Sequence, residues 1–213
     1  MPGIYLHIPF CSKKCTYCDF HFSTNIKNQI NEMTIKMIEE LKFRKNEIKQ
    51  KDIRSIYFGG GTPSLLRKKD FDVFFKNLNQ YKTDKLKEIT IEVNPEDISK
   101  EKLLLWKSYG INRLSIGVQS LNNEQLKWMN RSHIAEQNIQ SIMLAKSLGF
   151  QNISIDLIYG LPNMTNKEWS NQLDTIKDWG IQHISAYCLT VEKKTALMHY
   201  VNSKKVIMPG EEK

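Results

Sequence analysis

Short strand-like runs alternate with longer helical stretches along this chain, and this alternation limits the possible folds more than any other feature. Runs rich in β-branched and aromatic residues predict strands at 3–8, 55–60, 88–93, 113–118, 153–160 and 183–189. Apolar residues at helical spacing predict helices within 25–50, 66–80, 99–109, 122–148 and 166–179. Strands that alternate with helices pair in parallel through right-handed crossovers, so we expect an α/β fold. Periodicity alone leaves two arrangements open, a doubly wound open sheet and part of a barrel.

Polar and glycine-rich segments follow the predicted strands one after another. The first strand leads into a loop with three cysteines, and the fifth carries Asp156. The other strands end in GGGTPS (59–64), EVNP (92–95), GVQS (117–120) and Tyr187-Cys188, and the fifth runs into YGLP (159–162). Ligands of parallel α/β folds bind beyond the carboxyl ends of the strands in either arrangement. The sequence therefore predicts a ligand site at this end of the sheet.

The cysteine loop carries Cys11, Cys15 and Cys18 with the spacing C-x3-C-x2-C, and no fourth cysteine follows until Cys188. Three thiolates on a four-iron cubane leave one iron without a protein ligand, and that iron can bind a small molecule. The alternative is a zinc site of three thiolates completed by His21 or His7. Cys188 is predicted to be an incidental buried thiol.

The formal net charge is +8, from 31 Lys and Arg against 23 Asp and Glu. Such a charge could indicate a nucleic-acid partner or an anionic substrate. The lysines are scattered among acidic residues on the predicted helices, however, which is typical of solvated helix surfaces. We therefore expect no nucleic-acid partner. No apolar stretch approaches the length of a membrane span and the first residues lack the features of a signal peptide, so we expect a cytoplasmic protein.

The motif C-x3-C-x-Y-C at 11–18, together with GGGTP after the second predicted strand, resembles the radical S-adenosylmethionine (SAM) superfamily. Longer segments resemble its oxygen-independent coproporphyrinogen III oxidase group, and within it the haem chaperone branch: GIYLHIPFCSKKCTYCDF, IYFGGGTPSLL, ITIEVNP, RLSIGVQSLN, LKWMNRSH, ISIDLIYGLP and ISAYCLTVE. The resemblance runs from residue 3 to about residue 195 and implies a partial (β/α)6 barrel of the TIM type.

The resemblance also implies cofactors and the residues that bind them. It implies a [4Fe-4S] cluster on the three cysteines, SAM on the open iron, and a reduced flavodoxin or ferredoxin-type protein whose electron leads to cleavage of the sulfonium bond. Gly59 to Gly61 would let backbone carbonyls approach the bound ligand closely. The residues that match SAM contacts, or that lie beside the cluster, are Tyr5, Tyr17, Gly60, Gly61, Thr62, Glu92, Gln119, Arg131 and Asp156.

The oxidases and the haem chaperones of this group have different functions, so two functions are possible for this chain. Phe20 stands where the oxidases carry a further cysteine, which favours a haem chaperone that passes haem to acceptor proteins. The alternative is radical decarboxylation of coproporphyrinogen III to protoporphyrinogen IX, and a more distant one is a radical SAM enzyme that modifies tRNA. No residue is assigned a catalytic role. We expect chaperone activity rather than oxidase turnover.

The chain is expected to be a fragment of a longer protein. Pro209 followed by Glu211 and Glu212 indicates the start of a helix near the last residue. The resemblance implies a radical SAM core over 1–200, and 201–213 as the start of a C-terminal region in which the chaperone branch carries its H-N-x-x-Y-W haem motif.

Overall fold

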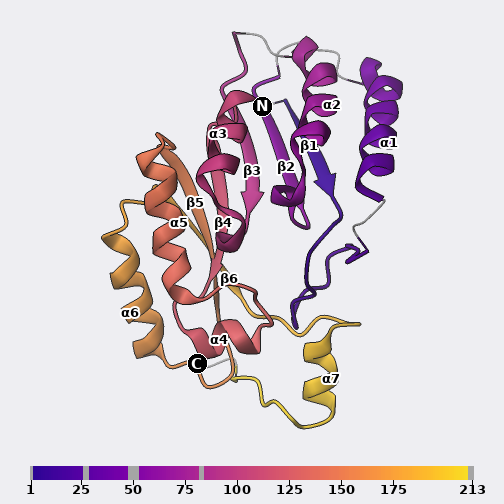
Figure 1. Cartoon of the computed structure of the whole chain (residues 1–213). Coiled ribbons are helices and arrows are strands. Elements are labelled where there is room, and N and C mark those ends of the chain that lie inside the picture. Colours follow the sequence, from indigo (N-terminus) through magenta and orange to yellow (C-terminus); the bar gives the residue numbers. More distant parts are fainter. Residues whose placement is uncertain (1, 26–28, 48–52, 82–83, 211–213) are drawn as a thin grey trace.

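The computed structural model has one six-stranded sheet, in which the strands stand side by side in chain order and every neighbouring pair is parallel (Figure 1). It describes residues 2–25, 29–47, 53–81 and 84–210. The strands are β1 (Gly3–Ile8), β2 (Ser55–Gly60), β3 (Glu88–Val93), β4 (Arg113–Gln119), β5 (Asn152–Tyr159) and β6 (His183–Cys188). All six predicted strands are confirmed, and each predicted end lies within one residue of the observed end.

The strand order decides between the two arrangements that periodicity left open. A doubly wound sheet reverses its strand order at a switch point, whereas here the order runs from β1 to β6 without reversal. The described strands β1 and β6 form the two ends of the sheet and are not paired with each other. The sheet is therefore a partial barrel, as the resemblance implied.

Helices cover the outer face of the sheet, and shorter ones lie near the carboxyl ends of the strands (Figure 1). The helices are α1 (Gln29–Phe43), α2 (Lys68–Leu78), α3 (Lys100–Ser108), α4 (Asn123–Trp128), α5 (Ala135–Ser147), α6 (Asn166–Lys177) and α7 (Ala196–Asn202). The 3-10 turns are η1 (Arg44–Asn46), η2 (Pro63–Leu65), η3 (Asn79–Tyr81) and η4 (Pro95–Asp97). None of the described helices is both long and apolar enough to cross a membrane.

Two helix predictions need correction. The single helix predicted within 122–148 is divided into α4 and α5, because Asn130 has a φ of 60° and therefore cannot continue a right-handed helix. Helix α7 was not predicted, since its seven residues are too few to show a clear period. The expected helix start beyond Pro209 falls on 211–213, outside the described residues.

The core lies between the outer face of the sheet and the helices. Phe58 of β2 is completely buried, with its ring centroid 5.9 Å from that of Phe71 and 5.7 Å from that of Phe74 on α2. Trp106 of α3 is also completely buried. Burial of such rings on the helical side is the main force that holds the strands in register.

Strand pleating turns the alternate side chains inward, and these inner side chains are largely polar. On β2, Tyr57 lies between the buried Ile56 and Phe58. On the neighbouring strands, Glu92 is in register with Ser115, and Ser115 with Ser154. The inner side of the sheet therefore supplies polar side chains to the space beyond the strand ends.

Candidate metal and cofactor site

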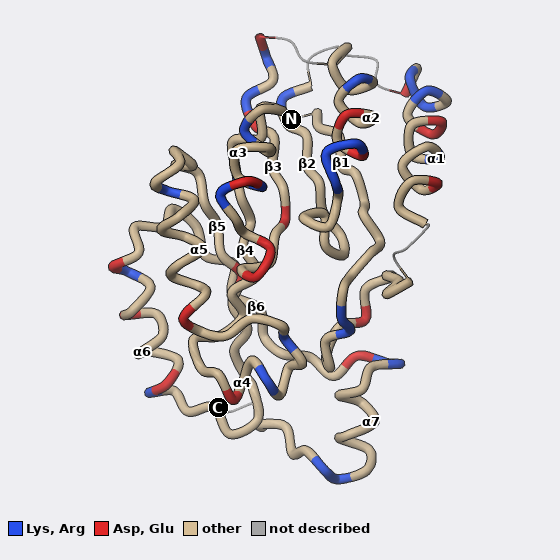
Figure 2. The backbone as a smooth tube through the Cα atoms, viewed as in Figure 1, with Lys and Arg blue, Asp and Glu red and all other residues tan. Residues whose placement is uncertain are grey.

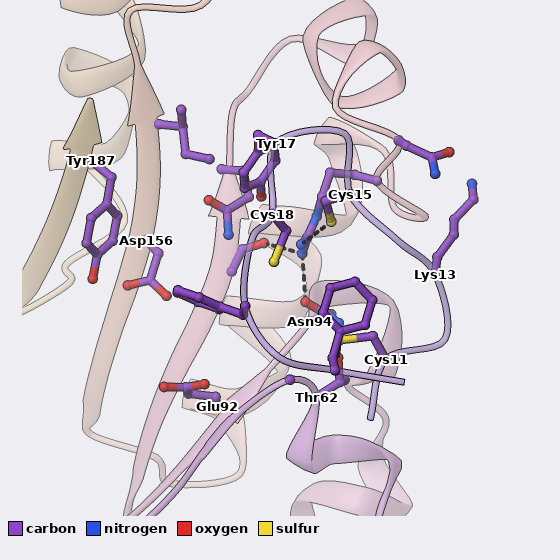
Figure 3. Close-up of a pocket in the computed structure, with 18 of the residues that line it drawn as sticks. Cys11, Lys13, Cys15, Tyr17, Cys18, Thr62, Glu92, Asn94, Asp156 and Tyr187 are labelled. Carbon is purple, nitrogen blue, oxygen red and sulfur yellow. Dashed lines mark hydrogen bonds between the residues drawn. The ribbon is translucent and has the colours of Figure 1, made fainter. Parts of the chain in front are cut away.

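A cavity of about 520 Å³ lies at the carboxyl ends of the strands, beside the cysteine loop. Figure 3 shows Cys11, Cys15 and Cys18 along one side of it, and Glu92, Asp156 and Tyr187 along the other. Of the residues proposed from the sequence, those that line it are Cys11, Cys15, Tyr17, Cys18, Gly60, Gly61, Thr62, Glu92, Gln119, Arg131 and Asp156. Residues from every strand end thus meet in one place, as parallel strands require.

Tyr5 is the proposed residue that the structure does not bring into this group. It points inward from β1, is 57% exposed, and lies outside the residues that line the cavity. Its hydroxyl is 3.0 Å from His7 Nδ1. A direct role for Tyr5 at the site therefore stays a prediction.

The cysteine loop is held by backbone hydrogen bonds to segments far away in the sequence. Cys11 N donates to Ser23 O at 3.1 Å, and Thr16 N donates to Met129 O at 3.2 Å. Leu197 N of α7 donates to Thr16 O at 2.8 Å. These bonds fix the loop from both sides, so its position depends on the assembled barrel and not on its own sequence.

All three thiols have soft donor chemistry, and those of Cys11 and Cys18 lie in surroundings that disfavour the thiolate. Burial raises the pKa of Cys18 to about 11; the Phe20 backbone opposes this shift, while Cys15, Cys11 and Asp19 add to it. Burial also raises the pKa of Cys11, partly opposed by a hydrogen bond from Thr62 Oγ1 to its sulfur at 3.5 Å. A bound cation would displace these protons and compensate the crowded negative charge. The donor set therefore fits an iron–sulfur cluster.

The two histidines considered for a zinc site do not lie with the cysteines. His7 Nε2 is 3.4 Å from the backbone oxygen of His21, and neither residue lines the cavity. In the part of the chain that the structure describes, no three His, Cys, Asp or Glu residues are grouped closely enough to hold one metal ion. The zinc alternative thus lacks a fourth ligand from either histidine.

Arg131 brings positive charge to the cysteine side of the cavity. Its Nη1 donates to Cys15 Sγ at 3.6 Å, and its Nη2 donates to Asn94 Oδ1 at 2.6 Å and to Gly117 O at 3.0 Å. Its Nε is buried and has no hydrogen-bond partner among the described residues. A buried guanidinium with a spare N–H donor is suited to an anionic group such as a carboxylate.

Glu92 supplies negative charge on the other side. One carboxylate oxygen accepts from the Tyr57 hydroxyl at 2.8 Å and the other from Gly60 N at 3.0 Å. Burial raises the pKa of Glu92; these two hydrogen bonds oppose the shift and Asp156 adds to it. Burial likewise raises the pKa of Asp156. Two carboxyl groups in one cavity make that side suitable for amine, sulfonium or hydroxyl groups.

Tyr57 and Asn94 hold these two charged groups but were not identified from the sequence as site residues. Tyr57 lies in the middle of a strand, where an aromatic residue is expected for packing. Asn94 follows β3 directly, in the strand-end segment where the sequence predicted ligand-site residues, but its contact with Arg131 depends on a residue 37 positions away. Only the Asn94 contribution could have been anticipated, from its place after a strand.

The three consecutive glycines are also needed for the packing of the loop itself, and their predicted close approach to a ligand stays a prediction. A Cβ on Gly59 would lie 2.8 Å from Glu92 Oε1, and one on Gly61 would lie 2.6 Å from Phe10 O. Gly60 has a φ of 106°, and a Cβ there would lie 2.6 Å from the His7 ring. The protein itself occupies the space that the missing side chains leave, so these glycines allow the loop to pack against β1, Glu92 and the cysteine loop.

Cys188 also differs from expectation. It is exposed and lines the cavity, whereas a buried thiol was predicted. The reason is that β6 is an end strand with little covering it, so five of its six residues are exposed.

Comparison with known proteins places the chain among a large family. The Radical SAM superfamily pattern matches residues 5–176. The heme chaperone HemW of Bacillus subtilis is 34% identical over 100% of this chain and 56% of its own length, and that of Escherichia coli is 30% identical over 99% and 55%. The solved coproporphyrinogen III oxidase HemN of Escherichia coli superposes with a TM-score of 0.81 at 26% identity, over 99% of this chain and 49% of that one.

The chain spans about half the length of these curated relatives. The superfamily match covers most of the chain and includes the cysteine loop, the ends of β1 to β5 and the helices between these strands. From its sequence pattern and its partial barrel, this chain belongs to the radical SAM superfamily.

Proposed function

We propose that this chain is the SAM-binding core of a haem chaperone that carries a [4Fe-4S] cluster and passes haem to an acceptor protein. Membership of the superfamily implies an iron–sulfur cluster and SAM. The observation that carries the proposal is the set of three thiols facing two carboxyl groups across one cavity, in a chain with heme chaperone relatives over its whole length.

Each side of the cavity has a separate part in this proposal. Cys11, Cys15 and Cys18 would hold the cluster, which together with bound SAM supplies one-electron chemistry. Arg131 would pair with the carboxylate of SAM, and Glu92 would attract the amine or sulfonium. Gln119 and Asp156 would bind hydroxyl groups of the ribose, while Tyr17 and Thr62 shape the cavity beside the cysteines.

A second hollow lies next to the cavity, and its lining is chemically suited to a flat anionic ligand such as haem. Its volume is about 290 Å³, and its lining includes Phe20 and Phe22 together with Lys14, Lys193 and Lys194. Phe20 is 65% exposed, so its ring is accessible to a ligand. Aromatic rings that face a tetrapyrrole, with lysines for its propionates, would be chemically complementary to haem.

Oxygen-independent coproporphyrinogen III oxidase is the second candidate. The observation in its favour is the superposition on the oxidase HemN with a TM-score of 0.81. Against it stands the exposed Phe20 at the position where the resemblance places a further oxidase cysteine. Both candidates would need a reduced flavodoxin or ferredoxin-type protein as electron donor for SAM cleavage.

We also propose that residues 1–200 form the radical SAM core and that 201–213 begin a further C-terminal region. The first turn of helix α7 supports this core, because Leu197 is completely buried and its backbone N–H bonds to Thr16 in the cysteine loop. A cytoplasmic location is proposed, since the three thiols need reducing surroundings to remain free for a cluster.

Anaerobic reconstitution with iron and sulfide tests the cluster. The chain should take up about four iron and four sulfide per molecule, with no zinc requirement. One tightly bound zinc with no sulfide would refute the radical SAM function for this chain.

Haem binding and turnover separate the two candidate functions. The corresponding full-length protein should retain haem stably and should not decarboxylate coproporphyrinogen III under reducing, anaerobic conditions. In the haem-binding measurement, a Lys193→Gln/Lys194→Gln double variant should weaken affinity by roughly tenfold, because two propionate partners are lost. The double variant Lys204→Gln/Lys205→Gln, in an exposed pair beyond α7, is the matched control. Turnover without haem retention would favour the oxidase.

A further inference from the structure

The end of helix α4 bonds to the middle of the cysteine loop at two neighbouring points. Thr16 N donates to Met129 O at 3.2 Å, and Asn130 Nδ2 donates to Lys14 O at 2.7 Å. The two loop residues precede and follow Cys15 in the sequence. The helix end therefore holds the backbone on both sides of this thiol.

The next residue along the chain, Arg131, contacts the thiol itself, because its Nη1 donates to Cys15 Sγ at 3.6 Å. Three consecutive residues after α4 thus hold three consecutive residues of the cysteine loop. Met129 takes part through its backbone oxygen, and Arg131 is also the proposed partner of SAM. The side chain of Asn130 has no part in the proposed chemistry, so its contact with the loop needs its own explanation.

The backbone at Asn130 has a conformation that usually belongs to glycine. Arg131 N donates to Leu126 O at 2.9 Å and Asn130 N donates to Lys127 O at 3.0 Å, which is the hydrogen-bond pattern of a Schellman helix end. Asn130 occupies the left-handed position of this motif, with a φ of 60°. Glycine is the residue most favoured there, because it has no Cβ.

Two other helices of this chain end in the same way, with glycine at that position. Gly110 after α3 has a φ of 86°, and its N donates to Lys107 O at 2.9 Å. Gly149 after α5 has a φ of 83°, and its N donates to Lys146 O at 2.8 Å. The turn thus forms without a side chain. What Asn130 adds after α4 is an amide that reaches the cysteine loop, at a position where asparagine is tolerated better than most residues.

We propose that Asn130 is a positioning residue for the cluster, because the bond from its amide to Lys14 O holds Cys15 in place beside Arg131. The inference rests on the proposed cluster site and adds a residue that is not a ligand but on which retention of the cluster depends. Asn130 is half-buried and lines the cavity, so the cavity wall partly shields this bond from water. Without the amide, the loop around Cys15 separates from α4 more often, and a displaced ligand exposes the iron to competing ligands.

Asn130→Gly removes the amide and leaves a backbone conformation that glycine readily adopts. A residue that served only the helix end would be replaced here at little cost. As a positioning residue, its loss should shorten the half-life of the reconstituted cluster by roughly two- to tenfold, which corresponds to one hydrogen bond. Loss of visible absorbance under anaerobic conditions, in the presence of an iron chelator, measures this half-life. Asn163→Gly is the matched control and should keep the wild-type half-life, since Asn163 has a φ of 64°, is exposed and lies outside the residues that line the cavity.

A second variant separates the amide donor from the shape of the side chain. Asn130→Asp keeps the size of the side chain, but at neutral pH it replaces the N–H donor with an acceptor and cannot donate to Lys14 O. It should shorten the half-life of the cluster at least as much as Asn130→Gly does. A wild-type half-life in Asn130→Asp would show that the donor is not needed and would overturn the proposal.

A further measurement needs no cofactor. Amide hydrogen exchange of the cofactor-free chain, followed by NMR, reports on Thr16 N–H, which bonds to Met129 O, and on Cys11 N–H, which bonds to Ser23 O at the start of the loop. In Asn130→Gly, the exchange rate at Thr16 should rise by roughly two- to tenfold, whereas the rate at Cys11 should stay within about twofold of the wild-type rate.

Either a wild-type half-life of the cluster or a wild-type exchange rate at Thr16 in Asn130→Gly would overturn the proposal. An equal loss of the cluster in Asn163→Gly would overturn it as well, because the effect would then not depend on the contact with the loop. A chain that assembles no cluster would refute the proposed function, and the exchange rate at Thr16 would still decide whether Asn130 holds the loop.

Discussion

At the scale of single residues, the cavity is set by a few side chains whose charges are partly satisfied by the protein and partly left for a ligand. Arg131 donates hydrogen bonds from Nη1 and Nη2 to Cys15, Asn94 and Gly117. Its Nε has no hydrogen-bond partner among the described residues. Glu92 accepts from Tyr57 and Gly60. Positive charge thus lies beside the thiols and negative charge across from them (Figure 3), as a ligand with an amine and a carboxylate would need.

Replacing a single loop cysteine should abolish cluster binding. Cys15→Ser removes one of three thiolates, and a cluster held by two protein ligands should not survive desalting, so iron content should fall to below about a tenth of wild type. Iron and sulfide assays of the anaerobically reconstituted protein measure this. Cys188→Ser, which also changes a thiol on the cavity wall, should retain the full content. Equal loss in both variants would contradict the assignment of ligands.

Removal of the Tyr57 hydroxyl should weaken SAM binding without unfolding the chain. Tyr57→Phe deletes the donor at 2.8 Å from Glu92, which raises the pKa of that carboxyl further and leaves it less well oriented. A lost hydrogen bond to a charged group corresponds to about 1.5–3 kcal/mol, or roughly 10- to 150-fold in the dissociation constant. Calorimetric titration with SAM checks this. Tyr109→Phe, which removes a donor to Asp72 on the helical face, should leave the constant unchanged.

At the scale of elements, the site depends on how the β2–η2 turn packs against the cysteine loop. Gly61 N donates to Ile8 O at 2.9 Å, and Thr62 Oγ1 donates to Cys11 Sγ at 3.5 Å. The turn after β2 is therefore part of the support of the first cysteine. A disturbance here should reach the cluster even though no ligand is changed.

A methyl group at Gly61 provides this disturbance. Its Cβ would lie 2.6 Å from Phe10 O and 2.8 Å from Ile8 O, which are backbone atoms that cannot rotate away. Gly61→Ala should lower the free energy of unfolding by about 1–3 kcal/mol and should reduce cluster retention. Urea denaturation and iron analysis measure the two effects. Gly210→Ala, where nothing lies within 4 Å, should be neutral, and a stable Gly61→Ala chain would show that the turn can move.

At the scale of the whole molecule, segments that are distant in the sequence line the same cavity. Its lining comes from the cysteine loop, from the ends of β2 to β6 and from the segment before α7. Basic residues are distributed over several elements, and acidic ones lie among them (Figure 2), so the charge of +8 is not confined to one surface. A ligand in the cavity would contact both ends of the sheet and act on the stability of the whole barrel.

Binding of SAM should therefore stabilise the entire fold. At a free concentration of about 100 times Kd, linkage predicts about 2.7 kcal/mol of added stability. For a chain of this size that corresponds to a rise in Tm of roughly 5–11 °C. Anaerobic calorimetry of the reconstituted protein measures the shift, with ATP, which has the adenosine but not the methionine, as the control ligand. An equal shift with ATP would indicate that the methionine moiety makes no specific contact.

Local patterns along the chain were enough to predict the α/β class, the strands and the set of candidate residues. Strand pleating and helical spacing are local properties, so Phe58 and Tyr57 carry their inward or outward direction in the pattern of β2 itself. The cysteine spacing and the strand-end segments likewise predicted the place of the cavity, because parallel strands bring their carboxyl ends to one edge. Tyr5 is the exception among the proposed residues, since position on an inward-facing strand does not guarantee contact with the cavity.

The strand order and the partners of the charged groups could be identified only in the folded chain. The contacts of Arg131 with Cys15 and of Glu92 with Tyr57 join residues 116 and 35 positions apart, and no local pattern records such distances. The physical reason is that burial and hydrogen bonding depend on which segments the barrel brings side by side, whereas periodicity depends only on neighbours along the chain.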